Sequence, residues 1–417
     1  MWRLGISYDL LPKESDILHL KFWNYAFELL KERNAIHFET SGKNQGCWIM
    51  RGAEKNNSIV SDPAAEAEKE FDEDKIIVRS NGTVTYVGKD MAYQLWKLGL
   101  LGMDFFYHPF HRYENGQVVY MTNSEHNQGI TEPKFGGGTR VYNVIDSRQS
   151  YLQNIVVAGL RALGYAAQAD QSTHFSYEMV ALSPRCCEEL GIQLSEEDRI
   201  KPYVEVSGRR GLGVKADDLI DTLLEKSIQE VMSRHPELAE SELQPIASSI
   251  AISALRYFLL KYTRNSVIAF DFKEALSFEG ETGPYAQYAV VRANNIFRKV
   301  LADDPAYNEK SVQSFVEDFA SEDFLKEKIH DEFWKLIYLA GQLESNVRVA
   351  LDTAEPAVVA KYVFTLAQAF NNFYHRHRIK EEADSAKKRF LLAVTRIVRD
   401  RLEAGLQILG ISVPEMM

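Results

Sequence analysis

Hydrophobic positions change their spacing midway along the chain. In the first half, an apolar run at Val141–Ile145 precedes a helical segment that extends to Leu163, and a second apolar run follows at Phe175–Leu182. This order predicts two parallel strands joined by a crossover helix. After Ala216, segments with a 3.6-residue period follow one another to the C-terminus. The sequence therefore predicts an α/β region followed by an all-α region.

Local signals place further elements in the first half. Apolar residues fall on one face of a helix expected over Glu14–Asn34. Lys75–Val87 contains two β-rich runs around Asn81-Gly82, a pair that type I′ hairpin turns favour. This hairpin would put Tyr86 near the end of a strand. Asp90 would lie at or near the start of the next helix, where a carboxylate interacts favourably with free N–H groups.

Composition and charge narrow the class of protein. A chain of 417 residues corresponds to about two or three domains, and its 45% hydrophobic and 26% charged residues are typical of folded proteins. The net charge of -11 argues against a general nucleic-acid coat, and we expect no DNA partner. The C-terminal part differs, because residues 361–410 carry ten basic and five acidic side chains.

The cysteines and the N-terminal residues indicate in which cellular compartment the protein works. Cys47, Cys186 and Cys187 are odd in number, and two are adjacent, which is poor geometry for a disulfide and favours a reducing environment. Neither a Cys-x-x-Cys pair nor a His-Glu-x-x-His helix occurs, so we expect no dedicated metal site. The first ten residues do not resemble a leader, and no apolar run approaches the roughly 18 residues of a membrane span. We therefore expect a cytoplasmic protein with no membrane partner.

Aromatic and cationic residues gather in the basic C-terminal part. Phe373-Tyr374-His375-Arg376-His377-Arg378 offers the groups that bind unstacked RNA bases and phosphates. A solvated helical face has the same composition, so the residues alone leave both interpretations open.

A glycine-rich basic loop precedes the all-α region. Its backbone N–H groups and the side chains of Arg209 and Arg210 are suited to hold polyphosphate, although ordinary surface loops share this pattern. Residues 204–219 resemble the variant signature loop that some bacterial arginyl-tRNA synthetases carry in place of Lys-Met-Ser-Lys. Gly208 stands at the position of the second lysine, which arginyl enzymes often lack.

Four further segments resemble the same family in the same order. Residues 74–90 resemble its Gly-Thr-x-x-Tyr-x-x-x-Asp segment, and residues 144–149 resemble the end of its next strand. Residues 278–292 resemble the entry to its helical anticodon-binding domain, which is the most specific match, and residues 409–417 resemble its C-terminal end. The resemblance covers essentially the whole chain.

The resemblance implies a domain organisation. Residues 1–215 would form an incomplete class I catalytic domain, Rossmann-like and nucleotide-binding, with insertions near 41–74 and 100–140. A helical connecting segment over 216–280 would lead to a helical anticodon-binding domain over 281–417. The family's His-Ile-Gly-His segment and the N-terminal domain that grips the tRNA elbow have no counterpart in this sequence.

The resemblance also implies roles for individual residues. Arginine would be bound by Tyr86, Asp90 and Gln149, because a planar five-donor cation calls for a carboxylate and neutral acceptors. The catalytic loop would be Ser207, Gly208, Arg209 and Arg210, which neutralise the phosphates of ATP as pyrophosphate leaves. ATP, supplied with Mg2+ as a substrate, would contact His174, Met179 and Ser207. No tightly bound cofactor is implied. Anticodon contacts would come from Tyr285, Tyr288, Arg292, Tyr374 and Met417.

Three functional hypotheses follow. In the first, the chain is an arginine-tRNA ligase for tRNA(Arg) that needs a missing, separately encoded or truncated N-terminal part. In the second, it is a catalytically inactive paralogue that binds tRNA. In the third, it is an adenylate-forming or amide-forming enzyme that has reused the fold. The residues Tyr86, Asp90 and Gln149 of the arginine pocket and the loop at Ser207 favour the first over the second, because a protein that only binds RNA has no need of them.

Overall fold

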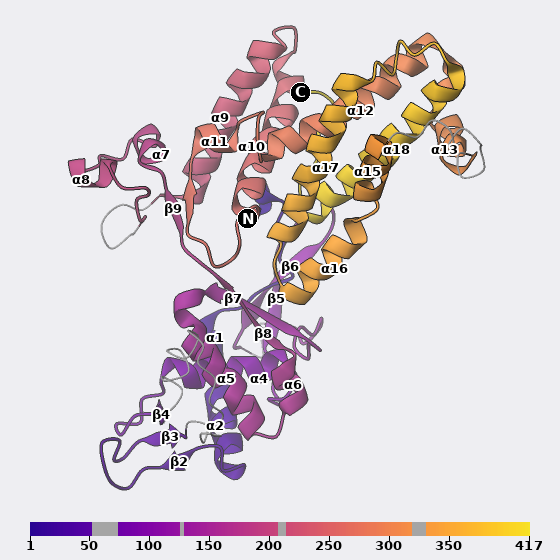
Figure 1. The fold of residues 1–417 in the computed structure, drawn as a ribbon. Coiled ribbons are helices and arrows are strands. Elements are labelled where there is room, and N and C mark those ends of the chain that lie inside the picture. Colours follow the sequence, from indigo (N-terminus) through magenta and orange to yellow (C-terminus); the bar gives the residue numbers. More distant parts are fainter. Residues whose placement is uncertain (52–73, 126–128, 207–213, 319–330) are drawn as a thin grey trace. The chain divides into compact units, whose positions relative to one another are not determined.

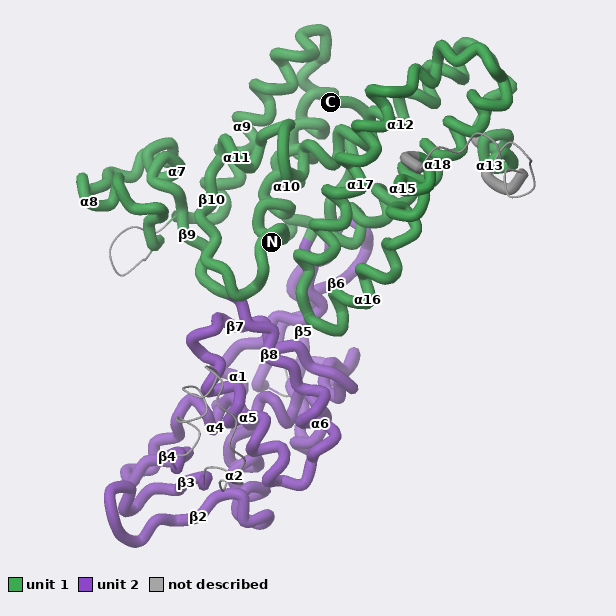
Figure 2. The backbone as a smooth tube through the Cα atoms, viewed as in Figure 1, with its two compact units in different colours: residues 1–5, 178–417 green, residues 6–177 purple. Residues whose placement is uncertain are grey.

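The computed structural model describes residues 1–51, 74–125, 129–206, 214–318 and 331–417 (Figure 1). The chain folds into two compact units (Figure 2). One comprises residues 6–177 and the other residues 1–5 with 178–417. We call them the α/β unit and the helical unit.

The α/β unit contains short sheets and the helices that cover them. Its strands are β1 (Leu10–Leu11), β2 (His37–Phe38), β3 (Trp48–Met50), β4 (Lys75–Val78), β5 (Phe106–Arg112), β6 (Val118–Asn123), β7 (Val141–Asp146) and β8 (Ser172–Tyr177). Its helices are α1 (Glu14–His19), α2 (Phe22–Glu32), α4 (Tyr86–Lys97), α5 (Ser150–Ala162) and α6 (Ala166–Asp170), with a short 3-10 turn at Ser147–Gln149. The sheets have the orders β1-β6-β5, β2-β3-β4 and β7-β8.

The predicted crossover unit is present. β7 and β8 are parallel, with Val141 opposite Ser172 and Asp146 opposite Tyr177, and α5 lies between them in sequence. The second apolar run is, however, two strands rather than one. Its first part is β8, whereas β9 (Val180–Leu182) pairs in parallel with β10 (Ile268–Phe270) of the helical unit.

Two other predictions for the α/β unit need correction. The helix expected over Glu14–Asn34 is divided into α1 and α2, because Lys21 adopts a left-handed backbone conformation with φ 57°. The hairpin at Asn81-Gly82 keeps its turn, with Gly82 at φ 82°, but its second arm is a single bridge between Val84 and Val78. Helix α4 already begins at Tyr86.

The early start of α4 has a local cause. Thr85 precedes the helix in an extended conformation, and its hydroxyl donates to the carbonyl oxygens of Ile76 (3.2 Å) and Ile77 (3.0 Å) of β4. These bonds hold the helix start against the strand. Tyr86 is therefore the first helical residue and Asp90 lies one turn further along, rather than at the helix start.

The core of the α/β unit is centred on α4. Phe22 of α2, Met91 and Leu95 of α4, and Leu160 of α5 are fully buried in one cluster. The aromatic rings of Phe22 and Phe105 lie 4.6 Å apart within it. Packing against α2 and α5 therefore fixes which face of α4 remains accessible.

The helical unit contains most of the long helices. They are α9 (Ala216–Arg234), α10 (Glu240–Leu260), α12 (Gly283–Asp303), α13 (Glu309–Asp318), α15 (Asp331–Ala340), α16 (Leu343–Thr353), α17 (Ala357–Arg376) and α18 (Ser385–Ile408). Shorter elements are α7 (Pro184–Glu189), α8 (Glu196–Arg199), α11 (Phe272–Ala275), the strands β9 and β10, and 3-10 turns at Trp2–Leu4 and Pro305–Tyr307. The predicted change from α/β to mainly helical structure is confirmed.

The largest core cluster of the helical unit joins α12, α17 and α18. Val290, Val363, Leu366 and Leu402 are fully buried within it. The start of helix α12 is fixed locally, because the Thr282 hydroxyl accepts a hydrogen bond from the backbone N–H of Tyr285 (3.2 Å) and Pro284 stands in the first turn. The fold is thus part of a Rossmann-like α/β domain together with a helical bundle.

One helix meets the length and composition of a membrane span. In the described part of the chain this is α10, with a mean hydropathy of 1.3 over its most apolar window, half of which is buried inside the fold. The fully buried residues Ala247, Ala254 and Tyr257 belong to the core clusters of the helical unit. α10 therefore has the features of a core helix.

The predicted domain limits stay predictions. Pairing of β9 with β10 joins residues 178–206 to the helical unit, although the sequence grouped them with residues 1–177. Much of the insertion expected near 41–74 lies outside the described residues. The insertion expected near 100–140 contains the hairpin of β5 and β6, which turns at Asn115-Gly116.

Candidate functional site

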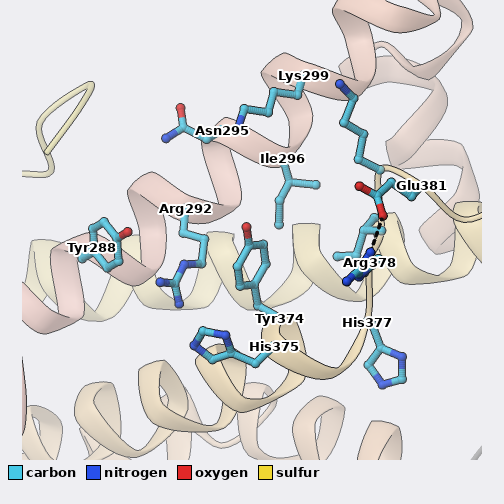
Figure 3. A pocket seen from close by; sticks show the side chains of 12 residues that line it. Tyr288, Arg292, Asn295, Ile296, Lys299, Tyr374, His375, His377, Arg378 and Glu381 are labelled. Carbon is cyan, nitrogen blue, oxygen red and sulfur yellow. Dashed lines mark hydrogen bonds and ion pairs between the residues drawn. The ribbon is translucent and has the colours of Figure 1, made fainter.

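A polar pocket of about 460 Å³ lies between α12, the end of α17 and the loop that follows α17 (Figure 3). Its walls are aromatic, amide, histidine and cationic side chains together with two isoleucines and one carboxylate. The lining residues are Tyr288, Arg292, Asn295, Ile296, Lys299, Tyr374, His375, His377, Arg378, Ile379, Lys380 and Glu381. We call it the bundle pocket.

Arg292 organises one end of the bundle pocket. Figure 3 shows its side chain between the rings of Tyr288 and Tyr374, and its guanidinium carbon lies 4.6 Å from each ring centroid. One guanidinium nitrogen donates to the side-chain oxygen of Asn371, which is buried on α17. Three of the predicted tRNA-binding residues, Tyr288, Arg292 and Tyr374, are therefore brought together.

The other end of the bundle pocket is cationic. Lys299 lies on α12, and Arg378 and Lys380 lie on the loop after α17. Arg378 pairs with Glu381 at 3.2 Å, and Lys380 pairs with Asp303 at 3.1 Å. Such exposed pairs are weak and exchange readily with other anions.

Only some of the basic residues in the C-terminal part line the bundle pocket. Several cations lie outside the bundle pocket and pair within the bundle: Arg396 and Arg399 with Asp400, Arg401 with Glu344, and Lys387 with Glu382. The cluster Phe373-Tyr374-His375-Arg376-His377-Arg378 is divided as well. Phe373 is buried in the core, while Tyr374, His375, His377 and Arg378 line the bundle pocket.

Two predicted tRNA-binding residues lie outside the bundle pocket. The ring of Tyr285 packs 5.6 Å from that of Phe364, against the main core. Met417 packs with Met416 on the cluster formed by α9 and α10, which includes Val231. Contacts of Tyr285 and Met417 with RNA stay predictions.

Tyr86 and Asp90 lie on one accessible face of α4 in the α/β unit. They are four residues apart, which places them one above the other along a helix. The Tyr86 side chain is 77% exposed, whereas Asp90 is half-buried. Burial raises the pKa of Asp90, and the charge of Glu14 raises it further, while Lys97 and Lys89 oppose the shift.

Gln149 lies at the end of the 3-10 turn that joins β7 to α5, and it is exposed. The turn is held by Asp146, whose carboxylate accepts from the backbone N–H of Arg148 (2.9 Å) and from its guanidinium (2.9 and 2.8 Å). These bonds hold the pKa of Asp146 down at about 2. Tyr86, Asp90 and Gln149 thus all belong to the α/β unit; the arginine-binding role of each stays a prediction.

The predicted ATP contacts are described in part. His174 lies on β8, and its Nε2 is 3.0 Å from the carbonyl oxygen of Ile145. Met179 belongs to the helical unit, where its carbonyl accepts from the backbone N–H of Ile268 at 3.1 Å. Ser207, Gly208, Arg209 and Arg210 lie outside the described residues. No group of three or more His, Cys, Asp or Glu side chains suited to a metal occurs in the described ranges.

Sequence reasoning missed three polar residues of the bundle pocket region. Asn295 and Lys299 lie seven and eleven residues after Tyr288 on α12, positions that a 3.6-residue period places on one face. Asn371 lies one turn before Tyr374 on α17 by the same rule. The helical spacing was thus available as a signal, but only the structure shows that the two helix faces meet.

Comparison with known proteins identifies the bundle. Residues 286–417, which include every residue that lines the bundle pocket, match the DALR anticodon binding domain. The whole chain is 31% identical over 423 residues to an arginine–tRNA ligase of Pyrococcus abyssi and 30% identical over 429 residues to one of Deinococcus radiodurans. The chain is a homologue of arginyl-tRNA synthetases.

The fold supports this homology. All of the chain superposes on 61% of Thermus thermophilus arginyl-tRNA synthetase with a TM-score of 0.76 and 26% sequence identity. Plasmodium falciparum arginyl-tRNA synthetase has the same fold at a TM-score of 0.64 and 17% identity. The chain spans 59% of the length of the Pyrococcus relative and 62% of the Deinococcus relative. The match fits the C-terminal part of the synthetases.

Proposed function

We propose that this chain carries the arginine-binding and anticodon-binding parts of an arginine-tRNA ligase. The reaction joins arginine to ATP as arginyl adenylate, releases pyrophosphate and transfers the arginyl group to the terminal ribose of tRNA(Arg). ATP enters with Mg2+ as a substrate. Protein synthesis in the cytoplasm is the setting in which this reaction operates.

The observation that carries the proposal is the bundle pocket within a DALR domain. A base can stack on the rings of Tyr288 or Tyr374, and Arg292 offers a planar cation for stacking or for a phosphate. Lys299, Arg378 and Lys380 extend the cationic surface along the pocket. This combination suits a single-stranded RNA loop, whereas a chain of net charge -11 is unsuited to bind nucleic acid over its whole surface.

The α4 face supports the catalytic half of the proposal. Asp90 supplies the negative charge for a guanidinium, and Tyr86 and Gln149 supply neutral acceptors that fix its direction. Ser207, Gly208, Arg209 and Arg210 are proposed to neutralise the ATP phosphates as pyrophosphate leaves. His174 and Met179 are proposed to lie beside the adenine.

A further polypeptide segment is proposed to complete the active site. Parallel strands are ordinarily covered on both faces, yet Val144 of β7 is 63% exposed and Tyr142 of the same strand is 49% exposed. The chain also matches about three fifths of its relatives. A separately encoded or covalently linked N-terminal part would cover these residues and supply the remaining contacts to ATP and to the arginine α-amino and carboxylate groups.

The alternative is a catalytically inactive synthetase paralogue that binds tRNA through the bundle. It predicts that Tyr86, Asp90 and Gln149 can be changed without functional effect. The ligase hypothesis is favoured because the acidic and neutral acceptors suited to a guanidinium occur together in the α/β unit.

The deciding experiment measures tRNA binding and arginylation in parallel. The 417-residue chain is tested with total tRNA, ATP, Mg2+ and labelled arginine, with and without the N-terminal part of a related synthetase. We expect Asp90→Ala to abolish charging and to leave tRNA binding intact, and Tyr288→Ala to weaken tRNA binding.

The matched controls lie on the same units. Asp170→Ala changes an exposed carboxylate of α6, and Tyr338→Ala changes an exposed tyrosine of α15 outside the bundle pocket. Charging by the wild type that persists in Asp90→Ala would refute the arginine assignment. tRNA binding without charging under both conditions would favour the inactive paralogue.

A further inference from the structure

Lys97 shares the α4 face that carries Asp90. The two residues are seven positions apart, which is almost two full helical turns. The Lys97 ammonium lies 4.5 Å from the centroid of the Tyr93 ring and donates a hydrogen bond of 2.8 Å to the side-chain oxygen of Asn143 on β7. Among the described residues Lys97 forms no direct ion pair with Asp90, so the carboxylate of Asp90 is not neutralised by a salt bridge from this lysine.

Asn143 links Lys97 to a network of buried amide side chains. Its side chain is 8% exposed, and its amide nitrogen donates to the side-chain oxygens of Gln94 (3.1 Å) and Gln153 (3.0 Å). Gln94 in turn donates to the Ser172 hydroxyl at 3.0 Å. Because an ammonium can only donate, Lys97 fixes the Asn143 oxygen toward itself, which turns the Asn143 nitrogen toward the oxygens of Gln94 and Gln153.

The amide network joins the two halves of the proposed guanidinium site. Lys97 and Gln94 come from α4, which carries Tyr86 and Asp90. Asn143 comes from β7, which leads through the 3-10 turn to Gln149. A network of fully paired buried polar groups is rigid and specifies one packing arrangement. Lys97 therefore acts at the junction between the helix that supplies the carboxylate and the strand that leads to the neutral acceptor.

Charge supports the same role. Lys97 is the strongest of the charged groups that act on Asp90, ahead of Glu14 of α1 and Lys89 of α4. Burial lowers the pKa of Lys97, and Asp90 opposes that shift. Each group thus favours the charged form of the other. The described parts of β4, α2 and α5, which also pack near α4, add no group that shifts the pKa of Asp90.

We propose that Lys97 is a positioning residue for guanidinium recognition: it fixes α4 against β7 through Asn143 and places a positive charge on the helix face that carries Asp90, where it favours the carboxylate over the neutral acid. This inference rests on the proposed function, because it assigns arginine to the face that carries Asp90. It adds a residue that touches neither the guanidinium nor ATP.

Three substitutions separate the two parts of this role. Lys97→Met removes the charge and the donor, Lys97→Gln keeps a donor for Asn143 without the charge, and Lys97→Arg keeps both. Lys89→Met is the control, because it removes a lysine of the same helix that pairs with Glu14 at 3.5 Å and takes no part in the amide network. Thermal unfolding identifies any variant that fails to fold.

The first measurement follows the Asp90 carboxyl by ¹³C NMR during a pH titration, with Asp90→Asn to assign its signal. We expect the titration midpoint of Asp90 to rise in Lys97→Gln and Lys97→Met by more than in Lys89→Met, and to stay near the wild-type value in Lys97→Arg. Equal midpoints in wild type and Lys97→Gln would overturn the proposal. This measurement needs no arginine.

The second measurement is arginine affinity by calorimetry at pH 6 and pH 8. A loss of arginine affinity is expected in Lys97→Met at both pH values, and the loss should be larger at pH 6, where a smaller share of the Asp90 carboxyl is ionised. A loss of the same size at both pH values would assign Lys97 a structural role and overturn the charge argument. If the wild-type chain binds no arginine, the proposed function fails for this chain, while the Asp90 titration still decides the role of Lys97.

Discussion

Arg292 of α12 donates a hydrogen bond to the side-chain oxygen of Asn371, a residue of α17 that is 6% exposed. The bond crosses between two helices and holds the guanidinium beside the rings of Tyr288 and Tyr374. The position of the Arg292 guanidinium at this end of the bundle pocket is thus set by a buried amide. This relationship leads to the first prediction.

Asn371→Leu should weaken tRNA binding although Asn371 does not line the bundle pocket. Without its acceptor, Arg292 loses a charge-assisted hydrogen bond and its fixed place between the rings, and we expect about a three- to tenfold loss of affinity. Fluorescence anisotropy with labelled tRNA measures the change. The control is Asn372→Leu at the adjacent exposed position. Equal affinities of the two variants would contradict the prediction.

Arg292→Ala should reduce the affinity for tRNA, and the salt dependence of binding then distinguishes contact with a phosphate from stacking on a base. If Arg292 neutralises a phosphate, the slope of log K against log salt should fall by about 0.7 for a single-stranded loop. If Arg292 only stacks on a base, affinity should fall with the slope unchanged. Arg401→Ala is a suitable control, because this arginine pairs with Glu344 outside the bundle pocket. An unchanged affinity in Arg292→Ala would exclude both modes.

Arginine binding should strengthen as the pH rises through the pKa of Asp90. Burial raises this pKa above its usual 3.8, so the neutral carboxyl, which cannot pair with a guanidinium, persists to higher pH than in an exposed aspartate. The folded chain also binds this proton more tightly than the unfolded chain does. The contribution of Asp90 to stability is therefore greatest below its unfolded pKa and declines as the pH rises toward the folded value.

Calorimetric titration with arginine between pH 4.5 and pH 8 measures this dependence. The affinity should rise and then level off, and Asp90→Asn should bind weakly with a flat pH profile. A wild-type affinity at pH 8 that is no stronger than that of Asp90→Asn would show that the carboxylate is not the anion that binds arginine.

Gly283→Ala should destabilise the helical unit. An added Cβ would lie 2.4 Å from the backbone oxygen of Ser253 on α10, and a backbone atom cannot move aside as a flexible side chain does. We expect a loss of about 1–3 kcal/mol, which is typical of overpacking in a core. Urea unfolding measures the loss. Gly341→Ala is the control, because its nearest contact would be an ordinary 3.4 Å; similar losses in both variants would argue against the steric explanation.

Cys186 should resist thiol reagents in the folded protein at pH 8. Burial raises its pKa to about 12, with a further contribution from the neighbouring Cys187, so almost no thiolate is present. Peptide mapping after brief exposure to iodoacetamide should find Cys186 unmodified, and the same treatment in denaturant should modify it. Rapid modification under native conditions would show that α7 opens readily.

The parts of the fold that the sequence predicts best depend on short-range patterns. The parallel pair β7 and β8 follows from two apolar runs with a helix between them, and the long helices of the helical unit follow from their 3.6-residue period. The single residue Lys21 shows the limit of such patterns. Its left-handed backbone divides a helix whose hydrophobic period is continuous on both sides.

For the proposed arginine site, the sequence predicted which residues take part but not how they are arranged in space. The spacing of Tyr86 and Asp90 is the same whether Tyr86 ends a strand or begins a helix, but only the early helix start puts both residues on one element, one turn apart on the same face. The start of α4 at Tyr86 depends on Thr85, whose hydroxyl donates to the carbonyl oxygens of Ile76 and Ile77 in β4. The hydrophobic pattern of the sequence does not show these hydrogen bonds.

The sequence by itself determined the order of the elements, the change from α/β to helical structure and the acidic, aromatic and basic residues available for function, because these depend on local pattern and residue chemistry. Only the tertiary structure decided that Asn371 orients Arg292 and that Lys97 reaches Asn143, since each contact joins elements far apart in the chain. Such contacts depend on how α12 meets α17 and how α4 meets β7. This packing minimises the free energy of the whole unit, so the sequence of any one helix or strand does not reveal it.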